Sequence, residues 1–86
     1  MNRIEWKPKA LKQLRKIDPQ HGAAIRKSVT AELTDLAQAS NVKALTNHQY
    51  GYRLRVGNYR VFFDHEGGKA QVVHIEEVKK RDERTY

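Results

Sequence analysis

Three arginines in the segment YRLRVGNYRVFF, residues 52–63, are the residues of this chain best placed to do chemistry. Two alternations of apolar and polar residues flank Gly57-Asn58, a pair typical of a two-residue β-hairpin turn. In such a hairpin Arg53 and Arg55 point to one face, and Arg60 lies opposite Arg55. Like charges in opposing positions destabilise a sheet, so this arrangement favours an anion-binding face over an ordinary solvated one. Several guanidinium groups around one phosphate would stabilise the added charge of a pentacoordinate phosphorane.

The remaining polar residues do not form a recognisable catalytic or metal-binding motif. The sequence has no phosphate-binding glycine loop, no Cys/His metal spacing and no Ser–His–Asp set. The histidines have no i, i+4 pairing, which favours ordinary surface or core positions for His21, His48, His65 and His74. Asp64 and Glu66, or Glu76 and Glu77, could form a pair of catalytic carboxylates. In so basic a chain, ordinary ion pairs with cationic side chains explain these four residues better. We therefore expect neither a metal nor a cofactor.

Length and charge limit the kind of protein and the kind of partner. A chain of 86 residues predicts one domain, residues 1–86. The net charge of +7 indicates a polyanionic partner: nucleic acid, a ribosome or an acidic protein. The chain has no cysteine, no apolar run near the ~20 residues that span a bilayer, and no apolar signal segment at its start. We expect a cytoplasmic protein with no membrane partner.

The first half of the chain predicts a strand followed by two helices. Residues 2–6 alternate weakly and favour a short strand. A helix then starts at Pro8, with apolar residues at helical spacing and a basic outer side. Asp18 fits the N-cap of a second helix, which is predicted to run from Pro19 to Ala39. The apolar residues of the two helices are Ala10, Leu11, Leu14, Ile17, Ile25, Val29, Leu33 and Leu36.

The second half predicts three antiparallel strands. Residues 41–49 have no clean period and favour a loop, with Leu45 as its anchor in the core. The arginine hairpin follows, then a turn at residues 66–69 and a strand over residues 70–78. That strand carries apolar residues at both parities, so its register stays open. The end, residues 79–86, is either a charged tail or a short helical turn.

These elements predict an α+β fold, in which an N-terminal strand and a two-helix hairpin accompany a mainly antiparallel sheet (β-α-α-β-β-β). The helices are expected to cover the sheet face that bears Leu54, Val56 and Val61. The opposite face, with the three arginines, is then left as an open basic surface.

The chain resembles the RelE/ParE superfamily of bacterial type II toxins. The resemblance covers essentially the whole chain, and its most specific segments are GYRLRVGNYRVFF and the ending VHIEEVKKRDERTY. The Lys-Arg…Tyr ending is similar to the RelE branch, whose members are endoribonucleases that cut mRNA in the ribosomal A site. The ParE branch shares the fold but poisons DNA gyrase, so a gyrase inhibitor without nuclease activity is the alternative. A third and less specific possibility is an accessory nucleic-acid-binding domain.

The resemblance implies a set of catalytic positions. Two strand lysines of RelE proteins fall on Arg53 and Arg55, and further family positions fall on Arg60, Arg81 and Tyr86. RelE-type cleavage uses the ribose 2′-OH to attack the adjacent phosphate without a metal. In that scheme Arg55 would take the proton, Arg53 and Arg60 would stabilise the phosphorane, Arg81 would assist the leaving oxygen, and Tyr86 would orient or stack the nucleotide.

Arginine is a poor general base, because its pKa lies above 12. The base is therefore a perturbed arginine or another residue, such as His48 or His65 if the fold brings either to the site, or the catalysis is largely electrostatic.

The resemblance also implies partners. These are a cognate antitoxin, the ribosome and mRNA, with operator DNA reached only through the antitoxin complex. Basic helix faces would attract an acidic antitoxin peptide. The residues expected to bind RNA or the ribosome are Lys9, Lys12, Lys16, Lys79, Lys80 and Arg84.

Overall fold

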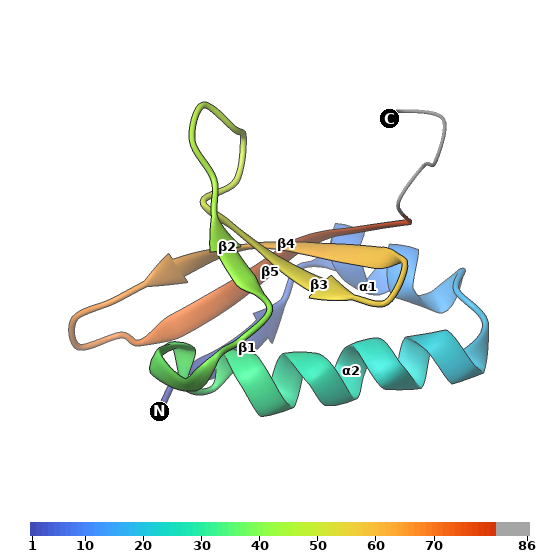
Figure 1. Cartoon of the computed structure of the whole chain (residues 1–86), viewed down its shortest axis with the longest axis horizontal. Helices are drawn as coiled ribbons and strands as arrows, with labels where there is room; N and C mark the ends of the chain where they lie inside the picture. The colour runs from blue at the N-terminus through green and yellow to red at the C-terminus, as the bar shows by residue number, and fades with distance from the viewer. Residues whose placement is uncertain (81–86) are drawn as a thin grey trace.

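The computed structural model describes residues 1–80, which form a five-stranded sheet packed with two helices (Figure 1). In chain order the elements are β1 (Arg3–Trp6), α1 (Pro8–Arg15), α2 (Pro19–Leu33), the 3-10 helix η1 (Leu36–Gln38), β2 (Val42–Ala44), β3 (Tyr52–Val56), β4 (Tyr59–Glu66) and β5 (Val72–Lys80). The predicted α+β class and its β-α-α-β-β-β order are confirmed, with the short strand β2 as an addition.

The strands lie in the order β1-β5-β4-β3-β2. β1 runs parallel to β5, and every other neighbouring pair is antiparallel, so the sheet is mainly antiparallel as predicted. α2 lies along one face of this sheet, and the loop between β2 and β3 rises from the other (Figure 1). Within residues 1–80, no helix lies over the outer face of β3 and β4 (Figure 1).

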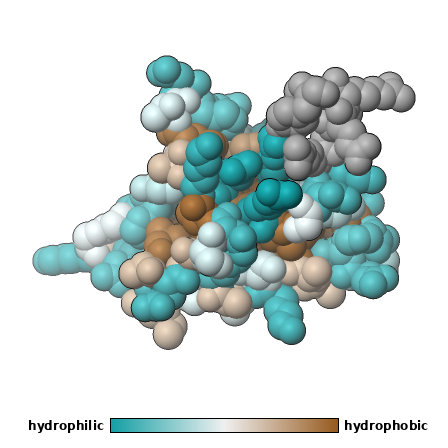
Figure 2. All heavy atoms as spheres, in the orientation of Figure 1, coloured by the Kyte–Doolittle hydropathy of each residue, from teal (hydrophilic) through white to brown (hydrophobic). Residues whose placement is uncertain are grey.

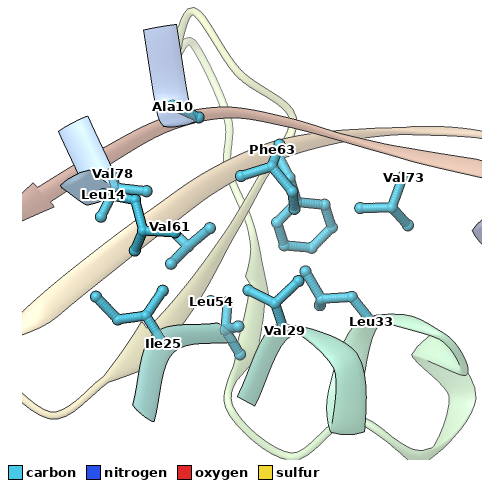
Figure 3. Close-up of a cluster of buried hydrophobic side chains, with 11 residues drawn as sticks. Ala10, Leu14, Ile25, Val29, Leu33, Leu54, Val61, Phe63, Val73 and Val78 are labelled. Atoms are coloured by element: carbon cyan, nitrogen blue, oxygen red, sulfur yellow. The ribbon is translucent and has the colours of Figure 1, made fainter. Parts of the chain in front are cut away.

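The hydrophobic core lies between α2 and the sheet (Figure 3). Ile25, Val29 and Leu33 follow one another at i, i+4 spacing, and all three are fully buried. They pack against strand residues Leu54, Val61, Phe63, Val73, Ile75 and Val78, while α1 contributes Ala10 and Leu14. This packing holds β3 and β4 flat against α2 and fixes which of their side chains point outward.

α1 continues along the edge of β5 where β1 ends. The last β1 pair joins Trp6 to Ile75. Just beyond it, the Lys7 N–H donates to the Ile75 carbonyl at 2.9 Å, and the Val78 N–H donates to Gln13 Oε1 at 2.7 Å. A side chain of α1 thus replaces a strand partner at this edge. Neither α1 nor any other helix in residues 1–80 is long and apolar enough to cross a membrane.

The arginine hairpin forms with the predicted register. Arg53 pairs with Phe62 and Arg55 with Arg60, across the turn Gly57-Asn58. Gly57 has φ 57°, the left-handed region that favours glycine at the first turn position. A two-residue loop leaves the strands one register, so the sequence alone was enough to place these side chains.

A β-bulge explains the apolar residues at both parities of β5. Phe62 pairs with Glu77, but the next residue, Phe63, pairs with Ile75. Glu76 is therefore the extra residue, and the parity of β5 changes at this point. Ile75 and Val78, three residues apart, both face the core as a result.

The bounds of α2 and of the last strand were predicted wrongly, and β2 was missed. α2 ends at Leu33 rather than Ala39, because Asp35 has an extended backbone and its carboxylate caps η1 through the Ala37 N–H at 3.1 Å. The segment predicted as a loop contains β2. The predicted last strand begins at Val72 and continues to Lys80.

The core anchor of that loop was also predicted wrongly. Leu45 is only half-buried and lies outside the central core, whereas Tyr50 is buried.

Candidate functional site

Six side chains form two parallel rows on the open face of β3, β4 and β5, as the strand register requires. One row consists of Arg53, Phe62 and Glu77, and the other of Arg55, Arg60 and Lys79. We call these six residues the arginine face. Figure 2 shows hydrophilic side chains on this side of the sheet, beside the raised β2–β3 loop. Lys43 on β2, which pairs with Arg53, extends the first row by one more cation.

The three arginines line a hollow of about 120 Å³, together with Gly57 at the hairpin turn. Arg53 and Arg60 are half-buried, whereas Arg55 is exposed. Arg53 Nε is buried and has no hydrogen-bond partner among residues 1–80. A buried donor left unpaired costs free energy. The hollow is thus lined by three guanidinium groups, one of which has an unsatisfied N–H.

Glu77 is the one buried charged residue in the described part of the chain, at 7% exposure. Its Oε1 lies 3.6 Å from Lys9 Nζ and 3.5 Å from Lys79 Nζ, and it also hydrogen-bonds to Tyr50. Burial alone would raise the pKa of Glu77, but the charges of Lys79 and Lys9 outweigh it and lower the pKa. Burial, with the nearby charge of Glu77, raises the pKa of Tyr50. Glu77 therefore ties two lysines to the arginine face as an anion.

The β2–β3 loop adds aromatic rings to the same face. His48 stacks on Phe62 with ring centroids 5.1 Å apart and an interplanar angle of 13°. Tyr50 packs against Phe62 as well, at 5.9 Å. The loop is tied to β4 because the Gly51 N–H donates to Asp64 Oδ1 at 2.8 Å.

Of the two histidines considered as a base, only His48 reaches the arginine face. His65 hydrogen-bonds to Asn2 at 3.2 Å and pairs with Val73, a core residue, so it lies on the helix-covered side. The Tyr50 N–H donates to His48 Nδ1 at 3.1 Å. Neutral His48 then carries its proton on Nε2 and has no free lone pair, so in this geometry it is a donor rather than a base.

The lysines expected to bind RNA do not all lie near the arginine face. Lys79 is part of the arginine face, and Lys9 reaches it through Glu77. Lys80 pairs with Tyr59, which packs against the core, so Lys80 belongs to the opposite side of β5. Lys12 and Lys16 are exposed at α1 and its end. Three of the expected site residues lie outside the described residues: Arg81, Arg84 and Tyr86.

Sequence reasoning did not single out Phe62, Tyr50, Glu77 or Lys43 as members of this site. The hairpin alternation already places Phe62 opposite Arg53, so that signal was available. Glu77 was assigned only to ordinary ion pairs, which it does form, but its position on this face depends on the bulge.

Elsewhere in residues 1–80 the structure has a further hollow and no metal-like cluster. No three acidic, histidine or cysteine side chains in this range come together as metal ligands would. A groove of about 440 Å³ runs between α1 and α2, with Leu14, Ile17 and Gly22 in its lining and Arg15 and Arg26 at its sides.

Comparison with known proteins places these features in a family. Residues 4–84 match the family model described as the ParE toxin of the type II toxin–antitoxin system parDE. A chain of the toxin–antitoxin complex RelBE2 from Mycobacterium tuberculosis superposes with a TM-score of 0.74 at 20% identity, covering 93% of this chain and 98% of that one. A chain of the archaeal RelE–RelB complex from Pyrococcus horikoshii gives 0.69 at 23% identity, covering 95% and 97%. None of the curated protein sequences matches the chain.

Proposed function

We propose that this chain, which belongs to the ParE toxin family of type II toxin–antitoxin systems in the RelE/ParE superfamily, is an endoribonuclease that cleaves mRNA in the ribosomal A site. The observation that carries the proposal is the hollow lined by Arg53, Arg55 and Arg60. Three guanidinium groups around one hollow suit a phosphodiester that passes through a more highly charged transition state.

In the proposed reaction the ribose 2′-oxygen attacks the adjacent phosphorus, and the bond from phosphorus to the 5′-oxygen breaks. The products are a 2′,3′-cyclic phosphate and a free 5′-hydroxyl, to which the proton of the 2′-hydroxyl is transferred in net terms. Arg53, Arg55 and Arg60 hold the nonbridging oxygens and stabilise the phosphorane. Arg81 assists the leaving oxygen and Tyr86 orients the nucleotide, as the family resemblance implies.

Charge stabilisation carries most of the rate enhancement in this proposal. Arginine stays protonated in proteins, so none of the three guanidinium groups is a good proton acceptor. The one free nitrogen lone pair of neutral His48 is already used by the Tyr50 N–H. Preorganised positive charges aimed at the transition state still supply large rate factors without a dedicated base.

A cognate antitoxin is the partner we infer for this toxin. The solved complexes RelBE2 and RelE–RelB contain chains of the same fold. The basic surface of α1 and the arginine face offer complementary charge to an acidic antitoxin segment. In this scheme the toxin acts on ribosomes in the cytoplasm and reaches operator DNA only as part of the antitoxin complex.

The test is primer extension on mRNA in a purified translation system. Wild-type protein should produce new 3′ ends within the A-site codon, and Arg53→Ala or Arg60→Ala should reduce the cleavage rate at least 100-fold, in line with the loss of one transition-state charge contact. Lys69→Ala, which removes an exposed cation of the β4–β5 turn, is the matched control and should cleave normally. Intact mRNA with the wild-type protein would refute the proposal.

Inhibition of DNA gyrase is the second candidate function. The observation that favours it is the family model itself, which is described as a parDE toxin. A supercoiling assay separates the two candidates, because a gyrase inhibitor would block supercoiling by purified gyrase and leave mRNA intact. An mRNA-cleaving toxin would cleave mRNA and leave supercoiling by gyrase unaffected.

A further inference from the structure

We propose that His48 and Phe62 form a stacking subsite for one nucleobase of single-stranded RNA, beside the arginines that hold its backbone. The subsite rests on the proposed function, because it takes the ligand to be RNA. It adds a specificity element, since it assigns a base contact to the aromatic rings beside the arginines.

The stacked pair has one buried and one exposed ring. Phe62 is 8% exposed and belongs to the strand β4, whereas His48 is an exposed residue of the β2–β3 loop. The centroid distance of 5.1 Å and the angle of 13° correspond to a parallel, offset stack. A flat ring fixed on a buried ring and open to solvent is the arrangement on which proteins stack unpaired bases.

The loop that carries His48 is preorganised rather than free. The Leu45 N–H donates to the Gly51 carbonyl at 2.9 Å, which closes the loop at its base. Gly51 is in turn held by Asp64, and the buried ring of Tyr50 packs on Phe62. Binding of a base here therefore costs little conformational entropy of the protein, because the loop is already ordered.

The ring orientation of His48 also provides a polar contact. Because Nδ1 accepts the Tyr50 N–H, neutral His48 has its proton on Nε2. Nε2–H is then the donor available to an acceptor on the base edge or the sugar. Stacking accepts any base, so this donor is the one feature of His48 that can discriminate between base edges.

The neighbours of Phe62 set the direction of the nucleotide. Arg53 lies opposite Phe62 on β3, about 4.8 Å away across the ladder, and Glu77 lies opposite it on β5. Glu77 is an anion already paired with Lys9 and Lys79, whereas the Arg53 guanidinium lines the hollow and attracts phosphate. A base over His48 and Phe62 therefore has its phosphate on the β3 side, at the hollow of the three arginines.

Fluorescence anisotropy with a labelled, uncleavable 2′-O-methyl RNA and the full-length toxin tests the subsite. His48→Ala should weaken binding about 5- to 100-fold, the range expected for the loss of one base stack. His48→Phe keeps the ring and should recover most of that affinity. His21→Ala is the matched control, because His21 also packs on an aromatic ring, Tyr59 at 5.6 Å, but on the helix-covered side.

A second measurement needs no variant of the protein. Moving a single abasic site along the oligonucleotide should weaken wild-type binding at one position much more than at the others. Equal affinity at all positions, His48→Ala binding as tightly as wild type, or no RNA binding at all would overturn the subsite. Loss in His48→Phe equal to that in His48→Ala would overturn it too, because the ring would not be responsible.

The two proposals fail in different ways. If wild-type protein cleaves mRNA on ribosomes but the abasic scan is flat, the subsite is wrong and the proposed function stands. If the scan shows one sensitive position but ribosomal mRNA stays intact, the subsite stands and the proposed reaction is wrong.

Discussion

Arg55 and Arg60 occupy directly opposing positions on β3 and β4. Opposing like charges destabilise an antiparallel pair by a few tenths of a kcal/mol up to about 1 kcal/mol. The turn Gly57-Asn58 fixes the register, so the two side chains stay opposite each other across β3 and β4. The pair lies in the hairpin that lines the hollow.

The first prediction concerns this pair. Arg55→Gln should raise the free energy of unfolding by about 0.2–1 kcal/mol at low ionic strength, because it removes one of two opposed charges. Urea unfolding at low and high salt checks this, and the gain should shrink as salt screens the pair. Added inorganic phosphate should stabilise the wild type more than the variant. A variant that is less stable than wild type at low salt would mean that Arg55 is held by an attraction instead.

The hairpin shows how far sequence reasoning reaches in this fold. Its register, and hence the shared face of Arg53, Arg55 and Arg60, followed from a two-residue turn and from alternation, both of which are local signals. The helix order and the fold class followed from apolar periodicity in the same way. These predictions hold because neighbouring residues determine them.

The rest of the site depends on contacts between distant parts of the chain. The burial of Glu77 requires the bulge at Glu76 and a lysine from α1, and neither leaves a local pattern in β5. Tyr50 joins the face only because its loop folds back on β4 through Gly51. β2 was missed because three residues are too few for a period to emerge.

The second prediction concerns the pH dependence of stability. The pKa of Glu77 is lowered in the folded state, so its stabilising contribution is present above its ordinary pKa of 4.5 and is lost as pH falls through the lower, folded-state pKa. Glu77→Gln should therefore be about 1 kcal/mol less stable than wild type at pH 7, and the difference should shrink below about pH 4.5. Thermal unfolding between about pH 3 and pH 7, a range in which Glu77 passes from protonated to ionised, measures this difference in stability.

Glu76→Gln is the matched control for this experiment. The ion pairs of Lys9 and Lys79 go to Glu77, so the neighbouring carboxylate should not share the effect. A constant difference between wild type and Glu77→Gln across the pH range would contradict the assigned role.

The third prediction concerns the glycine that anchors the β2–β3 loop. A Cβ at Gly51 would lie 3.3 Å from Asp64 Oδ1, so Gly51→Ala should strain the hydrogen bond to that oxygen and cost about 0.5–2 kcal/mol. Gly67→Ala is the control, because its Cβ would meet only His65 Cε1 at 3.9 Å, and it should stay within about 0.5 kcal/mol of wild type. Thermal unfolding compares the two. An equal change in stability for both substitutions would show that the loop accommodates the Gly51→Ala Cβ without strain.

The fourth prediction concerns the edge of β5 beyond β1. Val78 N–H has Gln13 Oε1 as its acceptor at 2.7 Å, so Gln13→Leu leaves a backbone donor unpaired at a partly buried position. The expected loss is about 1–3 kcal/mol, whereas Gln13→Glu keeps an acceptor and should lose less. Gln20→Leu, at an exposed position of α2, controls for the apolar substitution itself. Hydrogen exchange of the Val78 amide gives the specific readout. The exchange rate should increase in Gln13→Leu alone. An unchanged rate would mean that α1 packing, and not the Gln13 side chain, protects the strand edge.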